Sequence, residues 1–179
     1  MCPLAPHCFP CFNRSMKTLL VFALLCAPFV SAQNVEVEFD ESANFANYKT
    51  FRIGVGDVNS KAPALNNDIV KKNIESELRT RLTAKKLTEV TGQADLTVRY
   101  RLGSAQQTEA TAIPAGRLGR QRRIVRTKVT EGTLTIDLLA TRDLVWRAIV
   151  TEEESDPAKI SRKLDDMVKK AIDKYPPKK

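Results

Sequence analysis

The sequence predicts an α+β fold, a two-layer sandwich in which two helices pack on one face of a mostly antiparallel sheet of about five strands. Three observations predict it. Several segments alternate apolar and polar residues with a period of two, which is typical of strands with one buried face. Two longer segments repeat apolar residues at helical spacing. Their order, β-β-α-β-β-β-α, favours helices layered on a sheet.

Five segments are predicted to be strands. Residues 35–39 alternate Val and Phe with Glu, and residues 48–55 follow after a turn-rich link. Residues 96–102 have one polar face, and residues 134–138 pair with 144–150 across a short turn as a hairpin. The poorly apolar segment 103–122 is either a long loop or the distal part of a hairpin. Only the first helix could connect two parallel strands.

Two helices are predicted from caps and apolar stripes. The first begins near Asn66-Asn67-Asp68, which offers N-cap side chains, and it ends near Lys85-Lys86. The second begins at Asp156-Pro157 and ends before Pro176-Pro177. Leu78 and Leu164, each in the middle of a stripe, are expected in the core, as is Trp146. The stripes are Ile69, Val70, Ile74, Leu78 and Leu82, and then Ile160, Leu164, Val168, Ala171, Ile172 and Tyr175.

The first 32 residues are predicted to be a leader, followed by a single domain over residues 33–177. We expect the chain to start at Met16, from where a lysine precedes an apolar run, and Val30-Ser31-Ala32 is a small-residue cleavage site, so the mature chain should begin at Gln33. Lipid attachment at Cys26 is the alternative. Residues 1–15 are either an over-extended start or a long n-region. We expect export to the periplasm or the outer membrane of a bacterium.

The mature segment has neither cysteine nor histidine, since all four cysteines and the one histidine precede residue 27. This removes thiol nucleophiles, disulfides, the commonest general base and the commonest transition-metal ligand. We therefore expect no enzyme activity and no cofactor. Carboxylates remain as candidates: Asp137 with Asp143 could serve acid–base chemistry, although a strand and a turn explain both. Residues 152–154 with Asp156 could bind a hard cation, or could complement the N-terminus of the second helix.

Six cations between residues 117 and 128 form the sharpest feature of a chain whose formal net charge is +8. They could bind phosphate-rich headgroups or an acidic partner, or they could belong to a solvated loop. Aromatic residues are missing from this stretch, which argues against binding of single-stranded nucleic acid. The expected partner is an unknown envelope protein or an anionic lipid surface. The candidate anion-binding residues are Arg117, Arg120, Arg122, Arg123, Arg126 and Lys128.

The order and spacing of short motifs resemble the domain of unknown function 4136 family, exported and often lipidated bacterial proteins. The resemblance covers roughly residues 35–177 and implies an α/β sandwich in the cell envelope, without catalytic residues to carry over. Members often have an aromatic residue where Arg52 stands, and a glycine-rich or aromatic loop in place of the basic run. The matching residues are Asp40, Ala43-Asn44-Phe45, Tyr48-Lys49-Thr50-Phe51, Ile74, Leu78, Lys86-Leu87, Ala94-Asp95-Leu96-Thr97-Val98, Gly132-Thr133-Leu134-Thr135-Ile136-Asp137-Leu138, Leu144-Val145-Trp146-Arg147-Ala148, Ala171-Ile172 and Tyr175-Pro176-Pro177.

The sequence thus favours a non-enzymatic exported envelope protein that works as a binding or assembly module for an unknown ligand. Two alternatives stay open: an envelope hydrolase that uses carboxylates, and a purely structural partner in a larger envelope complex.

Overall fold

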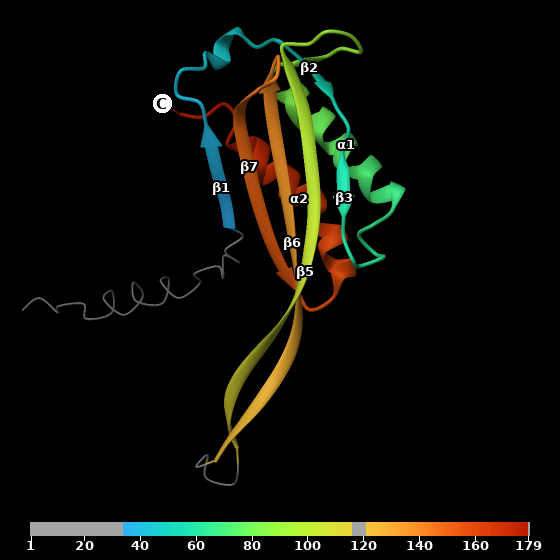
Figure 1. Ribbon diagram of the computed structural model, residues 1–179, viewed down its shortest axis with the longest axis vertical. Coiled ribbons are helices and arrows are strands. Elements are labelled where there is room, and N and C mark those ends of the chain that lie inside the picture. Colours follow the sequence, from blue (N-terminus) through green and yellow to red (C-terminus); the bar gives the residue numbers. More distant parts are fainter. Residues whose placement is uncertain (1–33, 116–120, 179) are drawn as a thin grey trace, which may run out of the picture. The chain divides into compact units, whose positions relative to one another are not determined.

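A mixed sheet of seven strands forms one layer of the computed structural model, and two helices pack on one face of it (Figure 1). The structure describes residues 34–115 and 121–178, so the predicted leader, including Met16, Cys26 and the cleavage site, lies outside the described residues. The elements are β1 (Asn34–Phe39), the 3-10 helix η1 (Phe45–Asn47), β2 (Thr50–Ile53), β3 (Asp57–Asn59), α1 (Asp68–Ala84), β4 (Thr88–Glu89), β5 (Leu96–Ala115), β6 (Gln121–Ala140), β7 (Asp143–Glu154) and α2 (Pro157–Asp173).

The sheet differs in two ways from the prediction of about five mostly antiparallel strands. Its order is β1-β7-β6-β5-β2-β4, and β3 also pairs with β5. Strands β2 and β3 run parallel to β5, and β4 runs parallel to β2. The sequence did not reveal β3 and β4 because strands of three and two residues are too short to show an alternating pattern. Helix α1 lies between β2 and β5 in the chain and makes their parallel pairing possible, as the sequence allowed for this helix.

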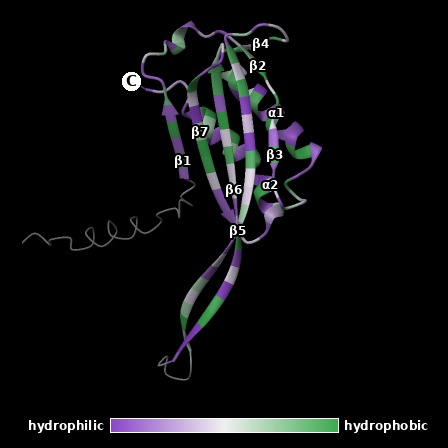
Figure 2. Cartoon of the chain, in the orientation of Figure 1, coloured by the Kyte–Doolittle hydropathy of each residue, from purple (hydrophilic) through white to green (hydrophobic). Residues whose placement is uncertain are grey.

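The core lies between the helices and the alternate residues of the central strands, which Figure 2 shows as alternating bands of high and low hydropathy. Leu78, Leu164 and Trp146 are fully buried, as expected from the sequence. Ile69, which was placed on the buried stripe of α1, is instead 70% exposed and lies in the first turn. Met167 is buried although it was not predicted.

Both helices begin at the side chains that the sequence indicates. The side chain of Asn67 accepts a hydrogen bond from the backbone N–H of Val70 at 2.9 Å, and that of Asp156 accepts one from Ala158 at 3.0 Å. Each carboxylate or amide oxygen satisfies an N–H group that has no partner inside its helix. Pro157 then occupies the first turn of α2, where a missing N–H costs nothing.

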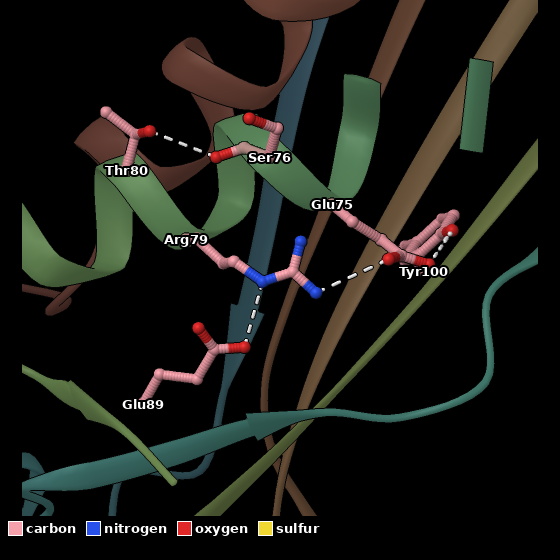
Figure 3. Close-up of polar contacts among 6 residues, drawn as sticks. All are labelled: Glu75, Ser76, Arg79, Thr80, Glu89 and Tyr100. Atoms are coloured by element: carbon pink, nitrogen blue, oxygen red, sulfur yellow. Dashed lines mark hydrogen bonds and ion pairs between the residues drawn. The ribbon is translucent and has the colours of Figure 1, made fainter. Parts of the chain in front are cut away.

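A polar network fastens α1 to β5 and β4 (Figure 3). The hydroxyl of Tyr100 donates to Glu75 at 3.0 Å, and Arg79 bridges Glu75 and Glu89 at 3.4 and 2.9 Å. Burial, followed by the hydrogen bond to Glu75, raises the pKa of Tyr100 well above its ordinary value. Gly56 lies against the ring, since a Cβ atom there would come within 1.9 Å of it.

The uncovered face of the sheet carries a row of alternating charges. Arg99, Asp137, Arg147 and Glu38 stand opposite one another in register across β5, β6, β7 and β1. Arg147 binds both oxygens of Asp137, with its Nε at 2.7 Å and its Nη2 at 3.0 Å. The bond to Asp137 is the main cause that raises the pKa of Arg147, and Glu38 adds to it. Opposite charges on neighbouring strands favour this register over a shifted one.

Helix α2 approaches the sheet closely at Gly132 of β6. A Cβ atom at this position would lie 2.7 Å from Cγ2 of Ile160, which is fully buried. The absence of a side chain therefore lets the first turns of α2 pack against β6 near the point where β7 ends.

We predict that Gly132→Ala lowers the free energy of unfolding by about 1–3 kcal/mol, because the added methyl group overpacks a filled site. Urea denaturation followed by circular dichroism measures this. Gly103→Ala is the matched control: that glycine lies in the neighbouring strand β5, and a Cβ atom there would meet nothing within 4 Å. Equal stability of the two variants would show that α2 does not press on Gly132.

Candidate binding surface on the β5–β6 arm

Strands β5 and β6 continue past the rest of the sheet as a two-stranded ribbon, which we call the arm: residues 107–115 and 121–129 (Figure 1). The last pair between β6 and β7 joins Thr130 to Glu154, and the last pair between β3 and β5 joins Asn59 to Gly103. Beyond these pairs both outer edges of the ribbon are unpaired among the described residues. The segment 103–122, for which the sequence allowed a loop or a hairpin, is therefore strand up to Ala115.

The sequence of β7 determines where the arm begins. Ser155 and Asp156 follow Glu154, and Asp156 caps α2, so the chain turns away from β6 at this point. Pro157 has no N–H group and could not continue the ladder. Among the described residues, the rest of β6 therefore pairs with β5 alone.

Charged groups fasten α2 to the strand end at the base of the arm. Lys163 of α2 binds Glu152, whose side chain is 5% exposed, and it reaches Glu154 at 2.6 Å. The hydrogen bond to Glu152 is the main cause that raises the pKa of Lys163, and the bond from Lys163 lowers the pKa of Glu154. Glu152 and Glu154 thus bind Lys163 of α2. The sequence suggested that these acidic residues bind a cation or complement the N-terminus of α2, and it did not indicate this role.

No side chain of the arm is buried. Every residue of the ribbon is exposed except Ala115 and Val129, which are half-buried. Even-numbered positions of β5 and β6 face the core, and their side chains are apolar as far as Leu102 and Leu134. In the arm, the even-numbered positions are occupied mainly by alanine, threonine and cations. The arm is held by its backbone ladder and by cross-strand contacts rather than by a core.

Register divides the predicted cations between the two faces of the arm. Arg122, Arg126 and Lys128 share one face, because alternate residues of a strand point the same way. Arg123 belongs to the other face. Arg117 and Arg120 lie outside the described residues, so the structure brings together three of the six predicted residues on one face and separates a fourth.

The face with three cations, which we call the cationic face, has no acidic residue in the arm. Its cross-strand partners are Pro114 for Arg122, Ala110 for Arg126 and Thr108 for Lys128. None of the three cations forms an ion pair or hydrogen bond with another described residue, so their charge is not neutralised within that part of the chain. Glu109 pairs with Thr127 on the opposite face. The cationic face therefore presents a row of free donors to an anion.

The distal arm also exposes three large apolar side chains that the sequence analysis did not single out. Ile113, Ile124 and Val125 are 42%, 62% and 37% exposed. They occupy three successive rungs of the ribbon, in which Thr111 faces Val125, Ala112 faces Ile124 and Ile113 faces Arg123. The sequence does hold a signal for them: they are isolated β-branched apolar residues in a segment that has no apolar stripe of its own.

The other candidate sites have structural partners. Asp137 is bound by Arg147, and Asp143 is an exposed residue at the start of β7. Within residues 34–115 and 121–178, no group of three or more His, Cys, Asp and Glu residues is placed to hold a metal ion. In the same described ranges, no helix is long and apolar enough to cross a membrane.

Several of the short motifs noted in the sequence meet at the end of the sheet opposite the arm. Phe45, Tyr175 and Trp146 stack edge to face, with ring centroids 5.8 and 5.7 Å apart in the successive pairs. Burial raises the pKa of Tyr175 to about 12. Phe45 also meets Phe39 and Tyr48 in the same manner.

Asp95 joins two more of these motifs. Its Oδ2 atom accepts hydrogen bonds from the backbone N–H groups of Lys49 and Thr50, both at 2.9 Å, and from the Thr50 hydroxyl at 2.8 Å. The backbone N–H of Asp95 in turn donates to the Thr50 hydroxyl at 3.0 Å. This exchange fixes the start of β2 beside the start of β5, and so determines the parallel register.

One family model, described as a domain of unknown function (DUF4136), matches residues 35–177, the span over which these motifs occur. The chain belongs to the DUF4136 family. No protein of curated function matches the sequence.

Solved structures share the fold at low sequence identity. A PDZ domain protein from Parabacteroides distasonis is 16% identical over 81% of this chain, with a TM-score of 0.55, and the match spans 36% of that longer protein. A DUF4136 family protein from Bacteroides thetaiotaomicron is also 16% identical, over 80% of this chain and 96% of its own length, with a TM-score of 0.50. At these identities the likeness shows the fold alone.

We predict that Asp95→Asn destabilises the protein at neutral pH, since a neutral amide is a weaker acceptor than a carboxylate for three donors. The hydrogen bonds from Lys49 and Thr50 lower the pKa of Asp95, so its stabilising effect is present above the unfolded pKa of about 4 and is lost as the pH falls through the folded pKa. Urea midpoints of both proteins, measured from pH 7 down to about pH 3, should converge. A constant difference over this range would contradict the role of the charge.

Proposed function

We propose that this chain is an exported, non-enzymatic binding module of the bacterial cell envelope, which holds an anionic partner on the cationic face of its arm. The observation that carries the proposal is the row of Arg122, Arg126 and Lys128 on a ribbon that contributes nothing to the core. A segment that buries no side chain adds little to stability, so its charges are free to serve binding.

Membership of the DUF4136 family and the signal-peptide pattern before Gln33 support an envelope location. Binding rather than catalysis is supported by the assignment of Asp137 and Glu152 to structural ion pairs. A hydrolase that uses carboxylates would have to free Asp137 from Arg147. A purely structural role in an envelope complex is the other alternative, and it predicts no affinity of the isolated protein for anions.

We predict that replacing Arg122, Arg126 and Lys128 together with Gln lowers the salt concentration at which the protein elutes from a heparin column. Heparin serves here as a soluble polyanion, and its binding is screened by salt. Stability should change little, because exposed unpaired charges contribute little to it.

The matched control is the triple variant Lys61→Gln, Lys72→Gln and Arg142→Gln. It removes the same charge from exposed positions that have no ion pair among the described residues. If the two triple variants elute alike, net charge and not the arm determines retention, and the proposal falls. The single variant Arg123→Gln, on the opposite face of the arm, should have a smaller effect than Arg126→Gln.

Export is tested separately. Mass spectrometry of the protein from an envelope fraction should find Gln33 at the mature N-terminus, because the apolar run and small residues before it fit cleavage after Ala32. An acylated Cys26 would contradict this cleavage site and make the protein a lipid-anchored one. Recovery of the full chain in the cytosol would contradict export.

A further inference from the structure

The distal end of the arm combines exposed apolar side chains with cations. Ile113, Ile124 and Val125 account for half of the large apolar residues that are exposed among the described residues, and they lie on consecutive rungs. Ile124 belongs to the cationic face, and Ile113 and Val125 belong to the opposite face. Each face of the ribbon therefore exposes apolar side chains at this level, next to cations, and exposed apolar groups rimmed by polar residues are a feature of interaction sites.

The two strands of this end differ in charge. Residues 110–115 of β5 carry no charged side chain, whereas residues 121–126 of β6 carry Arg122, Arg123 and Arg126. There is no acidic residue in either segment, and the nearest in the arm is Glu109. The end of the ribbon is thus an apolar strand paired with a cationic one.

A soluble polyanion would use the arginines but would leave the three apolar side chains in water. A lipid interface takes both: apolar groups enter the boundary between headgroups and acyl chains, and guanidinium groups remain at the phosphates. The flexible stems of Arg122 and Arg126 let their charges stay at headgroup level.

The backbone limits the depth of insertion. The outer edge of each strand in the arm is unpaired among the described residues, and an unsatisfied N–H or C=O group in hydrocarbon costs several kcal/mol. The ribbon can therefore lie in the hydrated headgroup region but cannot enter the core of a bilayer.

We propose that the distal arm, residues 110–115 and 121–126, is a shallow membrane-binding element for an anionic lipid surface. This inference rests on the proposed function and names its partner. Cations attract the arm to the surface, and Ile113, Ile124 and Val125 hold it there once the arm has arrived.

The first test is vesicle sedimentation with phosphatidylcholine alone and with about one third phosphatidylglycerol. The variant in which Ile113, Ile124 and Val125 are all replaced by Ser should bind the anionic vesicles at least about tenfold more weakly than the wild type, because it loses most of its apolar transfer free energy. Its retention on heparin should be unchanged, because its charges remain. Binding to phosphatidylcholine alone should be weak for every protein.

The chain supplies a matched control for the apolar residues. Val55, Ile69 and Leu144 are 89%, 70% and 41% exposed and lie outside the arm. Their replacement by Ser should leave vesicle binding as in the wild type. Circular dichroism and urea midpoints confirm that both variants are folded.

The outcomes separate the two proposals. If the apolar arm variant binds anionic vesicles as the wild type does, membrane insertion is wrong while polyanion binding by the cationic face stands. If the triple Gln variant of the cationic face keeps its heparin retention, the proposed function is wrong, and the membrane inference that rests on it is wrong too. If the arm variant and the control variant lose vesicle binding equally, the apolar residues of the arm are not specific to membrane binding and the inference is wrong.

The second test locates the arm in the bilayer. Trp146 is fully buried, so the wild type should show almost no quenching by brominated lipids. In Ile124→Trp the new indole should be quenched by bromine near the headgroup end of the acyl chain more than by bromine near the chain end. Absence of quenching by either lipid would overturn the inference.

Discussion

The two helices cover only part of the length of β5 and β6, and this mismatch determines where the core ends. Helix α2 lies against β6 at Gly132, and Lys163 ties it to the end of β7. In the arm, beyond the pair of Thr130 with Glu154, no described helix or third strand is available to bury a side chain, so apolar residues at the even-numbered positions would gain nothing from folding. The residue types change at this boundary. The length of sheet that the two helices cover thus determines both the extent of the sandwich and the start of the unburied ribbon.

The sequence predicted most of the sandwich because its elements are long and regular. Five strands and two helices were found from periods of two and about four, and Asn67 and Asp156 were among the predicted helix starts. The predictions failed where a pattern was short or local. Strands β3 and β4 pair through few residues, and Ile69 is exposed because it lies to one side of the buried stripe of α1, which begins at Val70.

The candidate site was predicted less well. A run of cations is visible in any sequence, but which of them share a face depends on the register of β5 with β6. That register is fixed far away, by the buried pairs of Leu102 with Leu134 and of Tyr100 with Ile136. The exposure of the apolar side chains in the distal arm was not predicted, because the sequence does not show how far along β5 and β6 the two helices cover the sheet. The roles of Glu152 and Glu154 likewise depended on the placement of Lys163.

The free edges of the arm have a consequence for the behaviour of many copies together. An exposed ribbon edge is a template on which another strand can add, and Val, Ile and Thr favour such addition. In this arm Pro114 of β5 and the cations of β6 are residues of the kinds that discourage such addition. Two ribbons brought together at their β6 edges would place Arg122, Arg126 and Lys128 against like charges. The side chains to which we assign anion binding would therefore also oppose the pairing of neighbouring molecules through β6.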